Sequence, residues 1–254
     1  MPCFRELQAL NMSRDTLYAQ ETVEDAPFEF TEDVARVFPD MLQRSIPGYA
    51  ASIKAIGTLA SEYVQPNSRC YDLGCSLGAA TLAMRRNIGA AGCRIIAVDN
   101  APAMVSRCRE MLAADEKPGP AEISVIEANI QDVEITRASM VVMNYTLQFL
   151  PLEERSAMIE KISKGLLPGG VLILSEKVVD EDPVVEKSLQ NLHHEFKRRN
   201  AYSDLEISRK RAALENVLVP ETVKAHKQRL ADAGFSNVGV WLRYFNFISI
   251  IAIR

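Results

Sequence analysis

The sequence has few cysteines, and their number and placement exclude a disulfide-stapled domain. There are five in 254 residues, an odd number, and all but Cys3 lie in or beside apolar segments, at positions 70, 75, 93 and 108. We therefore expect reduced, buried thiols. Cys70 and Cys75 flank a loop, but no histidine or cysteine follows at metal-ligand spacing, so we expect no metal.

Long apolar runs and an excess of one charge are also missing. The opening stretch, MPCFRELQALNMSRDTLYAQ, lacks the basic-then-apolar layout of a signal peptide, and no apolar run is long enough to span a bilayer. Lys and Arg number 29 against 33 Asp and Glu, a net charge of -4 that gives no global attraction to phosphate backbones. These features predict a soluble, cytoplasmic protein that contacts neither membranes nor nucleic acid directly.

What the sequence does have is a regular alternation of short apolar runs with helical stretches. The runs are rich in β-branched residues: RCYDLG, CRIIAVD, EISVIEAN, SMVVMN and GVLILSEK. Strands that are buried on both faces and alternate with helices predict an α/β fold with a doubly wound, parallel sheet. Two helical patterns precede the alternation, between Thr31 and Val64. Two strands joined by a tight turn near residues 244–246 are expected to end it.

The same alternation sets the expected domain organisation. Residues 1–30 are polar and aperiodic, so we expect an N-terminal arm, followed by a single α/β domain over residues 31–254. From about residue 180 to 219 the alternation stops, and charge falls on every face of two or three predicted helices. We interpret this segment as a helical insertion before the last two strands, a candidate lid or dimer contact. An amphipathic helix ended by Gly234 follows it.

The loop DLGCSLG is the expected ligand cradle, because the first strand-to-helix turn of a parallel sheet usually supplies it. Gly74 permits close backbone approach and Gly78 permits tight entry into the helix, but a pyrophosphate fingerprint lacks its third glycine. Asp72 favours a cationic group over an anionic one. Asp99 ends the next strand, where a carboxylate suits the paired hydroxyls of a ribose. Ribose, no phosphate and a nearby cation together fit S-adenosylmethionine.

From Arg69 to Arg254 the chain resembles the class I S-adenosylmethionine-dependent methyltransferases, which have a Rossmann-like sheet. After the glycine loop and VDNAPAM come EANIQDV as the adenine-edge loop, MVVMNYTLQFL as the fourth strand, and LLPGGVLILSE leading into the fifth. A single glycine loop is a weak signal, but five elements in the family's order are a strong one. The resemblance implies binding of S-adenosylmethionine.

More specific strings resemble the carboxy-S-adenosyl-L-methionine synthase family, which serves tRNA wobble-uridine modification. They include RDTL, VFPDMLQRSIPGY, YDLGCSLGAAT, HHEFKR, YSDLEIS and KRAALENV. The resemblance implies that the sulfonium methyl loses a proton and captures carbon dioxide released from prephenate. The products would be carboxy-S-adenosylmethionine and phenylpyruvate, and the family's dimeric habit implies a homodimer.

Carried over position by position, the resemblance implies a set of site residues. It places a catalytic, carboxylate-binding arginine at Arg211, whose guanidinium can grip the new carboxyl group through two hydrogen bonds and which also contacts the cofactor. Since Arg211 lies in the insertion, it is a candidate for reaching a partner subunit's pocket. The family usually has Asp where this chain has Asn129, and an Asn can still bond the adenine edge. The remaining cofactor contacts are Tyr49, Gly74, Cys75, Ser76, Asp99, Asn100, Ile130 and Asn144.

Several of these residues have plainer interpretations. Asp72 could cap its loop, and Asp99 could be a helix N-cap that also binds ribose. His193 and His194 point about 100° apart on a helix, so we interpret them as lid packing. The basic strings FKRRN and SRKR are expected to be solvated helix faces, apart from Arg211.

Two other functions remain open from the sequence. One is a conventional methyltransferase acting on a small carboxylic acid, in which Arg211 would hold the acceptor. The other is a catalytically silent subunit that binds the cofactor and regulates a tRNA-modifying partner. The proton acceptor is not identified by the sequence; the hydroxyl that leaves the substrate is one candidate.

Overall fold

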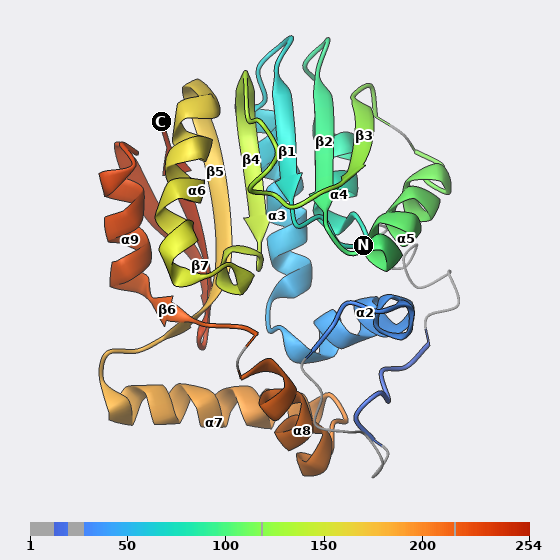
Figure 1. Ribbon diagram of the computed structural model, residues 1–254, viewed down its shortest axis with the longest axis vertical. Coiled ribbons are helices and arrows are strands. Elements are labelled where there is room, and N and C mark those ends of the chain that lie inside the picture. Colours follow the sequence, from blue (N-terminus) through green and yellow to red (C-terminus); the bar gives the residue numbers. More distant parts are fainter. Residues whose placement is uncertain (1–12, 20–27, 118, 216) are drawn as a thin grey trace.

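A central sheet with helices on both faces forms the frame of the protein (Figure 1). The structure is a computed structural model that describes residues 13–19, 28–117, 119–215 and 217–254. The strand order is β3-β2-β1-β4-β5-β8-β7, with the short β6 paired to β5. The strands are β1 (Arg69–Leu73), β2 (Arg94–Asp99), β3 (Glu122–Glu127), β4 (Ala138–Asn144), β5 (Leu166–Val179), β6 (Glu221–Thr222), β7 (Asn237–Tyr244) and β8 (Phe247–Ile253). The predicted doubly wound α/β fold is confirmed.

The order of the strands fixes where a ligand can bind. From β1 to β5 all neighbours are parallel, whereas β8 runs antiparallel to both β5 and β7. The chain moves outward from β1 to β3 and then returns to place β4 on the other side of β1. In open sheets of this kind the crevice at the carboxyl ends of the strands, where the order reverses, is the usual ligand site.

Both faces of the sheet carry apolar side chains that pack against helices. For this reason the strands appear in the sequence as continuous apolar runs. Cys70 packs with α3 and α4 on one face, whereas Tyr71 and Leu73 pack with α6 and α9 on the other. The helix α5 lies on the α4 side, where Cys108 meets Ala97. These helices are α3 (Tyr49–Tyr63), α4 (Ala79–Asn87), α5 (Pro102–Ala113), α6 (Leu152–Gly165) and α9 (Val223–Asp232).

A second layer of helices lies beyond the carboxyl ends of the strands, at the bottom of Figure 1. It consists of α2 (Glu32–Ser45) and the two helices of the insertion, α7 (Pro183–Arg199) and α8 (Asp204–Leu214). Each of these helices begins at a residue that caps it. Thr31 caps α2 by accepting a hydrogen bond from Val34 N–H, and Asp182 precedes the proline that begins α7. At the start of α8, Ser203 forms a capping box with Glu206. Two or three helices were predicted for the insertion, and its described residues form two.

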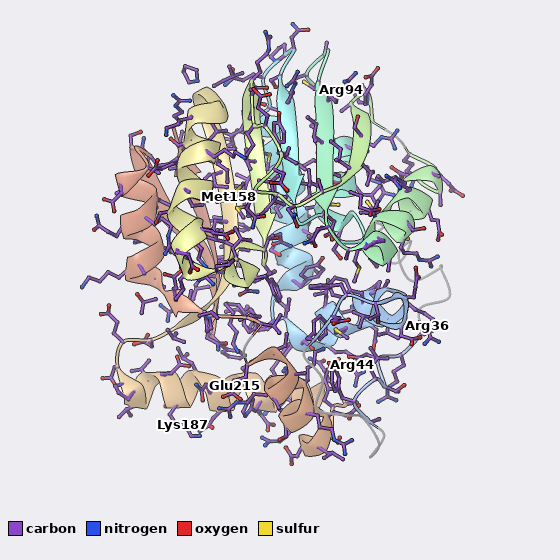
Figure 2. All side chains as sticks on the ribbon, in the orientation of Figure 1. Arg36, Arg44, Arg94, Met158, Lys187 and Glu215 are labelled. Carbon is purple, nitrogen blue, oxygen red and sulfur yellow. The ribbon has the colours of Figure 1, made fainter. Side chains whose placement is uncertain are left out.

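Arg44 ties the insertion to α2 (Figure 2). Its Nε donates to the carbonyl of Asn200 and its Nη2 to that of Ala201, both at 2.7 Å. The guanidinium also stacks 3.8 Å from the centre of the Tyr202 ring. Since the α7–α8 connection has its carbonyls held in this way, the insertion is anchored over the end of the sheet.

Part of the predicted N-terminal arm is packed against this layer. Asp15 is 1% exposed, and it accepts a hydrogen bond from the Tyr202 hydroxyl. Phe28 is buried, and its N–H donates to the carbonyl of Ala213. The rest of the arm, residues 1–12 and 20–27, lies outside the described residues.

The C-terminal elements follow the sequence pattern closely. Gly234 adopts a φ of 88° just after α9, and Phe245 takes a φ of 53° in the turn between β7 and β8. The two-residue strand β6 was not predicted, because so short an extended segment has no periodicity to read. Within the parts of the chain that the structure covers, no helix combines the length and apolar character needed to cross a membrane.

Candidate functional site

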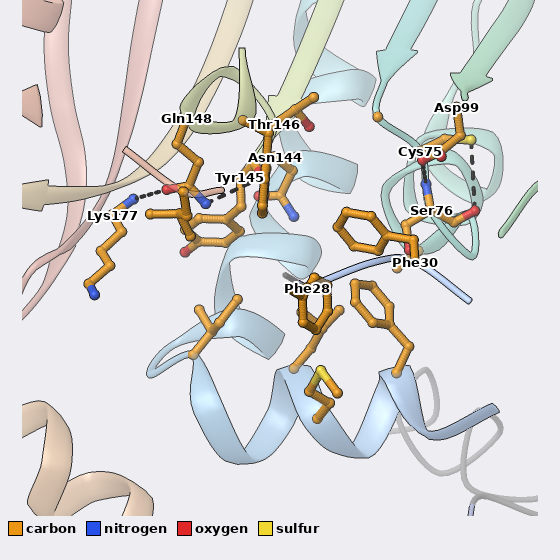
Figure 3. A pocket seen from close by; sticks show the side chains of 18 of the residues that line it. Phe28, Phe30, Cys75, Ser76, Asp99, Asn144, Tyr145, Thr146, Gln148 and Lys177 are labelled. Carbon is orange, nitrogen blue, oxygen red and sulfur yellow. Dashed lines mark hydrogen bonds between the residues drawn. The ribbon is translucent and has the colours of Figure 1, made fainter. Parts of the chain in front are cut away.

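A cavity of about 320 Å³ opens at the carboxyl ends of the strands, enclosed by α2 and the insertion. Figure 3 shows Cys75, Ser76 and Asp99 on one side of it and Lys177 on the opposite side, with Phe28 and Phe30 between them. The two sides are named here the loop end and the lysine end. Every predicted cofactor-binding residue except Arg211 lines this cavity.

The backbone of the glycine loop is fixed by β2. The N–H groups of Gly74 and Cys75 both donate to the carbonyl of Val98, at 2.8 and 2.9 Å. Gly74 has a φ of 79°, and a Cβ there would collide with the side chain of Thr146. A left-handed backbone in such close contact requires glycine, so the loop presents bare backbone to the cavity.

Asp72 lies at the base of this loop, on the cavity wall. Its Oδ2 accepts a hydrogen bond from the Thr81 hydroxyl at 2.5 Å. The partner is therefore a side chain nine residues on, and not the backbone two residues on that a loop cap would use. Burial raises the pKa of Asp72 to about 6, and the hydrogen bonds from Thr81 oppose the rise. A buried carboxylate beside a cavity gains from a cationic ligand.

Asp99 connects the end of β2 to the glycine loop. Its Oδ2 accepts from Ser76 N–H at 2.8 Å and its Oδ1 from Ala101 N–H at 3.0 Å. Burial raises the pKa of Asp99, and these backbone bonds lower it. Ala101 is the residue at the N-cap of α5, so Asp99 is not the helix cap. A carboxylate can accept about four hydrogen bonds, so acceptor capacity remains for ribose hydroxyls.

A chain of carboxamides extends from Asp99 towards the predicted adenine edge. Asn100 Nδ2 donates to Asn129 Oδ1 at 3.0 Å, and Asn129 Nδ2 donates to Asp132 Oδ2 at 3.2 Å. Ile130 is buried beside them on the cavity wall. The Asn that replaces the family's Asp is thus held by neighbours on both sides, and its contact with adenine stays a prediction.

Two buried polar atoms at the end of β4 lack partners. Asn144 Oδ1 and Tyr145 Oη have no hydrogen-bond partner among the described residues, although both residues line the cavity. Tyr49, the first residue of α3, also lines it, and burial raises its pKa, which keeps its phenol neutral. Buried acceptors are nearly always paired in native proteins, so an unpaired carbonyl oxygen beside a cavity fits a donor on a ligand.

Arg211 is the predicted site residue that the structure does not bring to the others. It is exposed in the last turn of α8 and lies outside the cavity lining of its own chain. Its charge nevertheless lowers the pKa values of Lys177 and His194, so it lies on the same side of the molecule as the lysine end. Its role in binding a carboxylate stays a prediction.

Three lysines in the cavity lining were missed: Lys177, Lys197 and Lys210. The expectation that the basic strings FKRRN and SRKR are solvated is wrong for Lys197 and Lys210, which are 9% and 5% exposed. Lys177 had a readable signal, because it follows the buried run of β5 at the carboxyl end of that strand. The other two had none, since their burial depends on contacts made across the insertion.

His193 packs between the insertion and its neighbours, as predicted, but it also lines the cavity, which was not predicted. Its Nε2 donates to the carbonyl of Ser45 at 2.8 Å, and its ring meets Phe247 edge-on with 4.8 Å between centres. Burial lowers the pKa of His193 to about 2, so the ring is neutral. Within the described ranges, no group of three or more potential metal-ligating side chains was found.

The cysteines also match their interpretation. Four described cysteines are free and buried, at positions 70, 75, 93 and 108, whereas Cys3 lies outside the described residues.

Comparisons with known proteins agree with this geometry. A family model described as a methyltransferase domain matches residues 71–170. Among solved structures, an O-methyltransferase family protein from Burkholderia thailandensis superposes with a TM-score of 0.64 at 16% identity, covering 98% of this chain and 70% of that one. Human N-acetylserotonin methyltransferase in complex with SAM gives 0.60 at 17% identity, covering 99% and 66%. These likenesses show the fold of the class I methyltransferases.

Curated relatives are far more similar in sequence. A carboxy-S-adenosyl-L-methionine synthase from Geobacter sp. (strain M21) is 55% identical over 94% of this chain and 98% of its own length. One from Vibrio campbellii is 55% identical over 94% and 97%. With that identity over nearly the whole length of both chains, the protein belongs to the carboxy-S-adenosyl-L-methionine synthase family.

Proposed function

We propose that this protein converts S-adenosylmethionine and prephenate to carboxy-S-adenosylmethionine and phenylpyruvate. The observation that carries the proposal is a single cavity with two different polar ends. The loop end has carboxylates and the lysine end has ammonium groups, and the unpaired carbonyl oxygen of Asn144 lies between them (Figure 3). One end suits a cationic nucleoside, and the other suits an acid.

The residues of the loop end, together with Asn144 in the middle of the cavity, fit S-adenosylmethionine on four grounds. Asp99 keeps acceptor capacity for a ribose, Asp72 offers a buried carboxylate to a cation, and Asn144 Oδ1 lacks a hydrogen-bond donor among the described residues. The bare backbone at Gly74 lets a ligand approach closely. When bound, the sulfonium makes its methyl group acidic and thus a source of a carbon nucleophile.

Aromatic side chains separate the two ends and keep the middle of the cavity apolar. Phe30 contacts Phe28, Phe38 and Phe149, with ring centres 5.1, 5.9 and 5.7 Å apart. A cavity with little water protects a carbanion from protonation and retains carbon dioxide beside it. The described residues thus favour carbon–carbon bond formation where the acid and the nucleoside meet.

The proposed chemistry balances without a protein base. Prephenate loses its ring carboxylate as carbon dioxide, and the electron pair of the broken bond makes the ring aromatic as the hydroxyl leaves. The departing hydroxide takes a proton from the methyl group and becomes water. The methyl carbon then forms its new bond to carbon dioxide.

We further propose a cytoplasmic homodimer in which Arg211 grips the new carboxyl group in the partner's cavity. Exposure of Arg211 outside its own cavity supports this arrangement, and free thiols fit a reducing compartment. The product would serve tRNA wobble-uridine modification through another enzyme, since the net charge of -4 gives this chain no attraction to RNA. An Arg211→Lys variant should keep affinity for S-adenosylmethionine but lose carboxylated product, because Lys cannot reproduce the paired hydrogen bonds.

The decisive experiment follows a carbon label. Purified protein is incubated with S-adenosylmethionine and prephenate carrying ¹³C in the ring carboxylate, and the nucleotides are weighed by mass spectrometry. We expect a labelled species heavier than S-adenosylmethionine by one carbon dioxide. Accumulation of S-adenosylhomocysteine with an added acid would instead indicate a conventional methyltransferase. Consumption of neither substrate would indicate a silent subunit.

A further inference from the structure

The lysine end is assembled from three elements that are far apart in the sequence. Lys177 comes from β5, Lys197 from α7 and Lys210 from α8, and all three line the cavity. The charges of Lys177 and Lys210 both lower the pKa of Lys197, so the three ammonium groups lie within electrostatic range of one another. Convergence of like charges in a cavity is unfavourable unless an anion completes it.

The three lysines differ in what neutralises them. Lys210 Nζ lies 3.5 Å from Asp15 Oδ2 and 3.4 Å from Ser45 Oγ. Lys177 and Lys197 have no ion-pair or hydrogen-bond partner for their ammonium groups among the described residues, although Lys197 is only 9% exposed. Burial lowers the pKa of Lys197 to about 7 and also lowers that of Lys177. Glu186 acts on the pKa of Lys177 and Asp15 on that of Lys197, and both raise it, but neither carboxylate forms an ion pair with these ammonium groups among the described residues. The two cations therefore face the cavity without a directly bonded acid.

We propose that Lys177 and Lys197 bind the carboxylate that the co-substrate acid keeps through the reaction. The inference rests on the proposed function and deepens it, since it assigns the acid's orientation as well as its binding site. Lys210 also lines this end of the cavity, but its charge is balanced by Asp15. The acid then spans from the lysine end, past the aromatic side chains, to the loop end.

Electrostatics decides which of the acid's two carboxylates the lysines hold. The ring carboxylate loses its negative charge as carbon dioxide forms. Cations fixed on it would stabilise the reactant more than the transition state and slow the reaction. The 2-oxo acid carboxylate keeps its charge throughout, so binding it anchors the substrate at no such disadvantage. The departing carboxylate is thereby directed towards the methyl group.

Phenylpyruvate is the probe, because it carries only the retained carboxylate. The variant Lys197→Met removes a buried charge while keeping side-chain length, so it should fold. Its inhibition constant for phenylpyruvate and its KM for prephenate should both rise on the order of 10- to 100-fold, the worth of one charged hydrogen bond. Its Kd for S-adenosylmethionine, from calorimetry, should stay unchanged. The variant Lys177→Met should behave in the same way.

Lys187→Met is the matched control. Lys187 is an exposed residue of the same helix, outside the cavity lining, and Figure 2 shows it on the side of α7 away from the sheet. This variant should have the same inhibition constant for phenylpyruvate and the same KM for prephenate as the wild type. The uncharged methyl ester of phenylpyruvate gives a second control, since the wild type should prefer the acid and Lys197→Met should lose that preference.

The inference and the proposed function fail in different ways. If the wild type makes labelled carboxy-S-adenosylmethionine but folded Lys197→Met and Lys177→Met bind phenylpyruvate as tightly as the wild type, the lysine subsite is wrong and the function stands. If the wild type makes no carboxylated product, the proposed function is wrong. Direct titration of phenylpyruvate into the wild type and the variants then decides on the subsite alone.

Discussion

The loop end and the lysine end of the cavity are built on different principles. The loop end is held mainly by backbone hydrogen bonds: the N–H groups of Gly74 and Cys75 donate to Val98, and Asp99 accepts hydrogen bonds from two backbone N–H groups. At the lysine end, long side chains from three separate elements meet, and two of the ammonium groups form no ion pair or hydrogen bond with the described residues. The loop end belongs to the sheet and is already ordered, whereas the lysine end depends on the insertion.

This difference separates a feature of the shared fold, the loop end, from a feature of this sequence, the lysine end. Structures at 16 to 17% identity share the fold over almost the whole chain, and the backbone-built end needs little more than that fold. A side-chain site across an insertion needs specific residues at specific places. We therefore expect substitutions at the two ends to affect different ligands and to change stability in different directions.

The largest effect is expected at the loop end, from Gly74→Ala. The new Cβ would strike Thr146, and alanine is strained at a φ of 79°. Strain and clash together should weaken binding of S-adenosylmethionine on the order of 100-fold, measured as Kd by calorimetry. The control is Gly89→Ala, where no atom lies within 4 Å of the added Cβ. Equal affinities in the two variants would show that the loop end is not preformed.

A smaller effect of opposite sign is expected at the lysine end, from Lys197→Met. Without ligand, this variant should be more stable than the wild type by about 1–3 kcal/mol at pH 6, because an unpaired buried charge is removed. Urea unfolding at pH 6, 8 and 10 measures the difference. A variant less stable than the wild type at pH 6 would show that the ammonium has a partner that compensates its burial.

The pH dependence of that difference has a defined sign. The pKa of Lys197 is about 7 in the folded protein against 10.5 for an ordinary lysine. Between these two pH values the unfolded chain binds more protons than the folded protein, so the free energy of unfolding rises with pH. The destabilisation by Lys197 is therefore complete below about pH 7 and disappears above pH 10.5. The variant's advantage should shrink from pH 6 to pH 10. The charged and titratable groups that face Lys197 are Lys177, Lys210, Asp15 and His193, and they are present in both proteins, so the difference reports the removal of Lys197 together with its coupling to them.

The smallest effect is expected from Asn144→Leu, a change between the two ends of the cavity. Its unpaired Oδ1 destabilises the protein in the absence of ligand, so a similarly sized apolar side chain should raise stability by about 1 kcal/mol. The same change should weaken S-adenosylmethionine binding about tenfold. Asn87→Leu is the control, because Asn87 Nδ2 already donates to Ala83 and its loss should bring no gain. Lower stability in Asn144→Leu would mean that the amide is satisfied.

How much the sequence revealed also differs between the two ends. The sheet, the glycine loop and Asp99 follow from local patterns, because strand periodicity and a left-handed glycine are set by nearby residues. The lysine end was missed because helices with charge on every face give no sign of which charge is buried. Lys210 and Arg211 make the point: neighbours on a helix diverge by about 100°, so one lines the cavity while the other is exposed.

The strand β5 fixes the spacing between two residues that line the cavity, Lys177 on β5 itself and Asn144 on the neighbouring strand β4. Ser175 pairs with Asn144 in the sheet register, and Lys177 follows two residues later on the same strand. At about 3.3 Å per residue, the backbone positions of these two markers are roughly 7 Å apart. Because β5 is hydrogen-bonded to a strand on each side, neither marker can slide without the other. For the acid proposed above, we expect this fixed spacing to make binding sensitive to length, so homologues one carbon longer or shorter should bind less tightly.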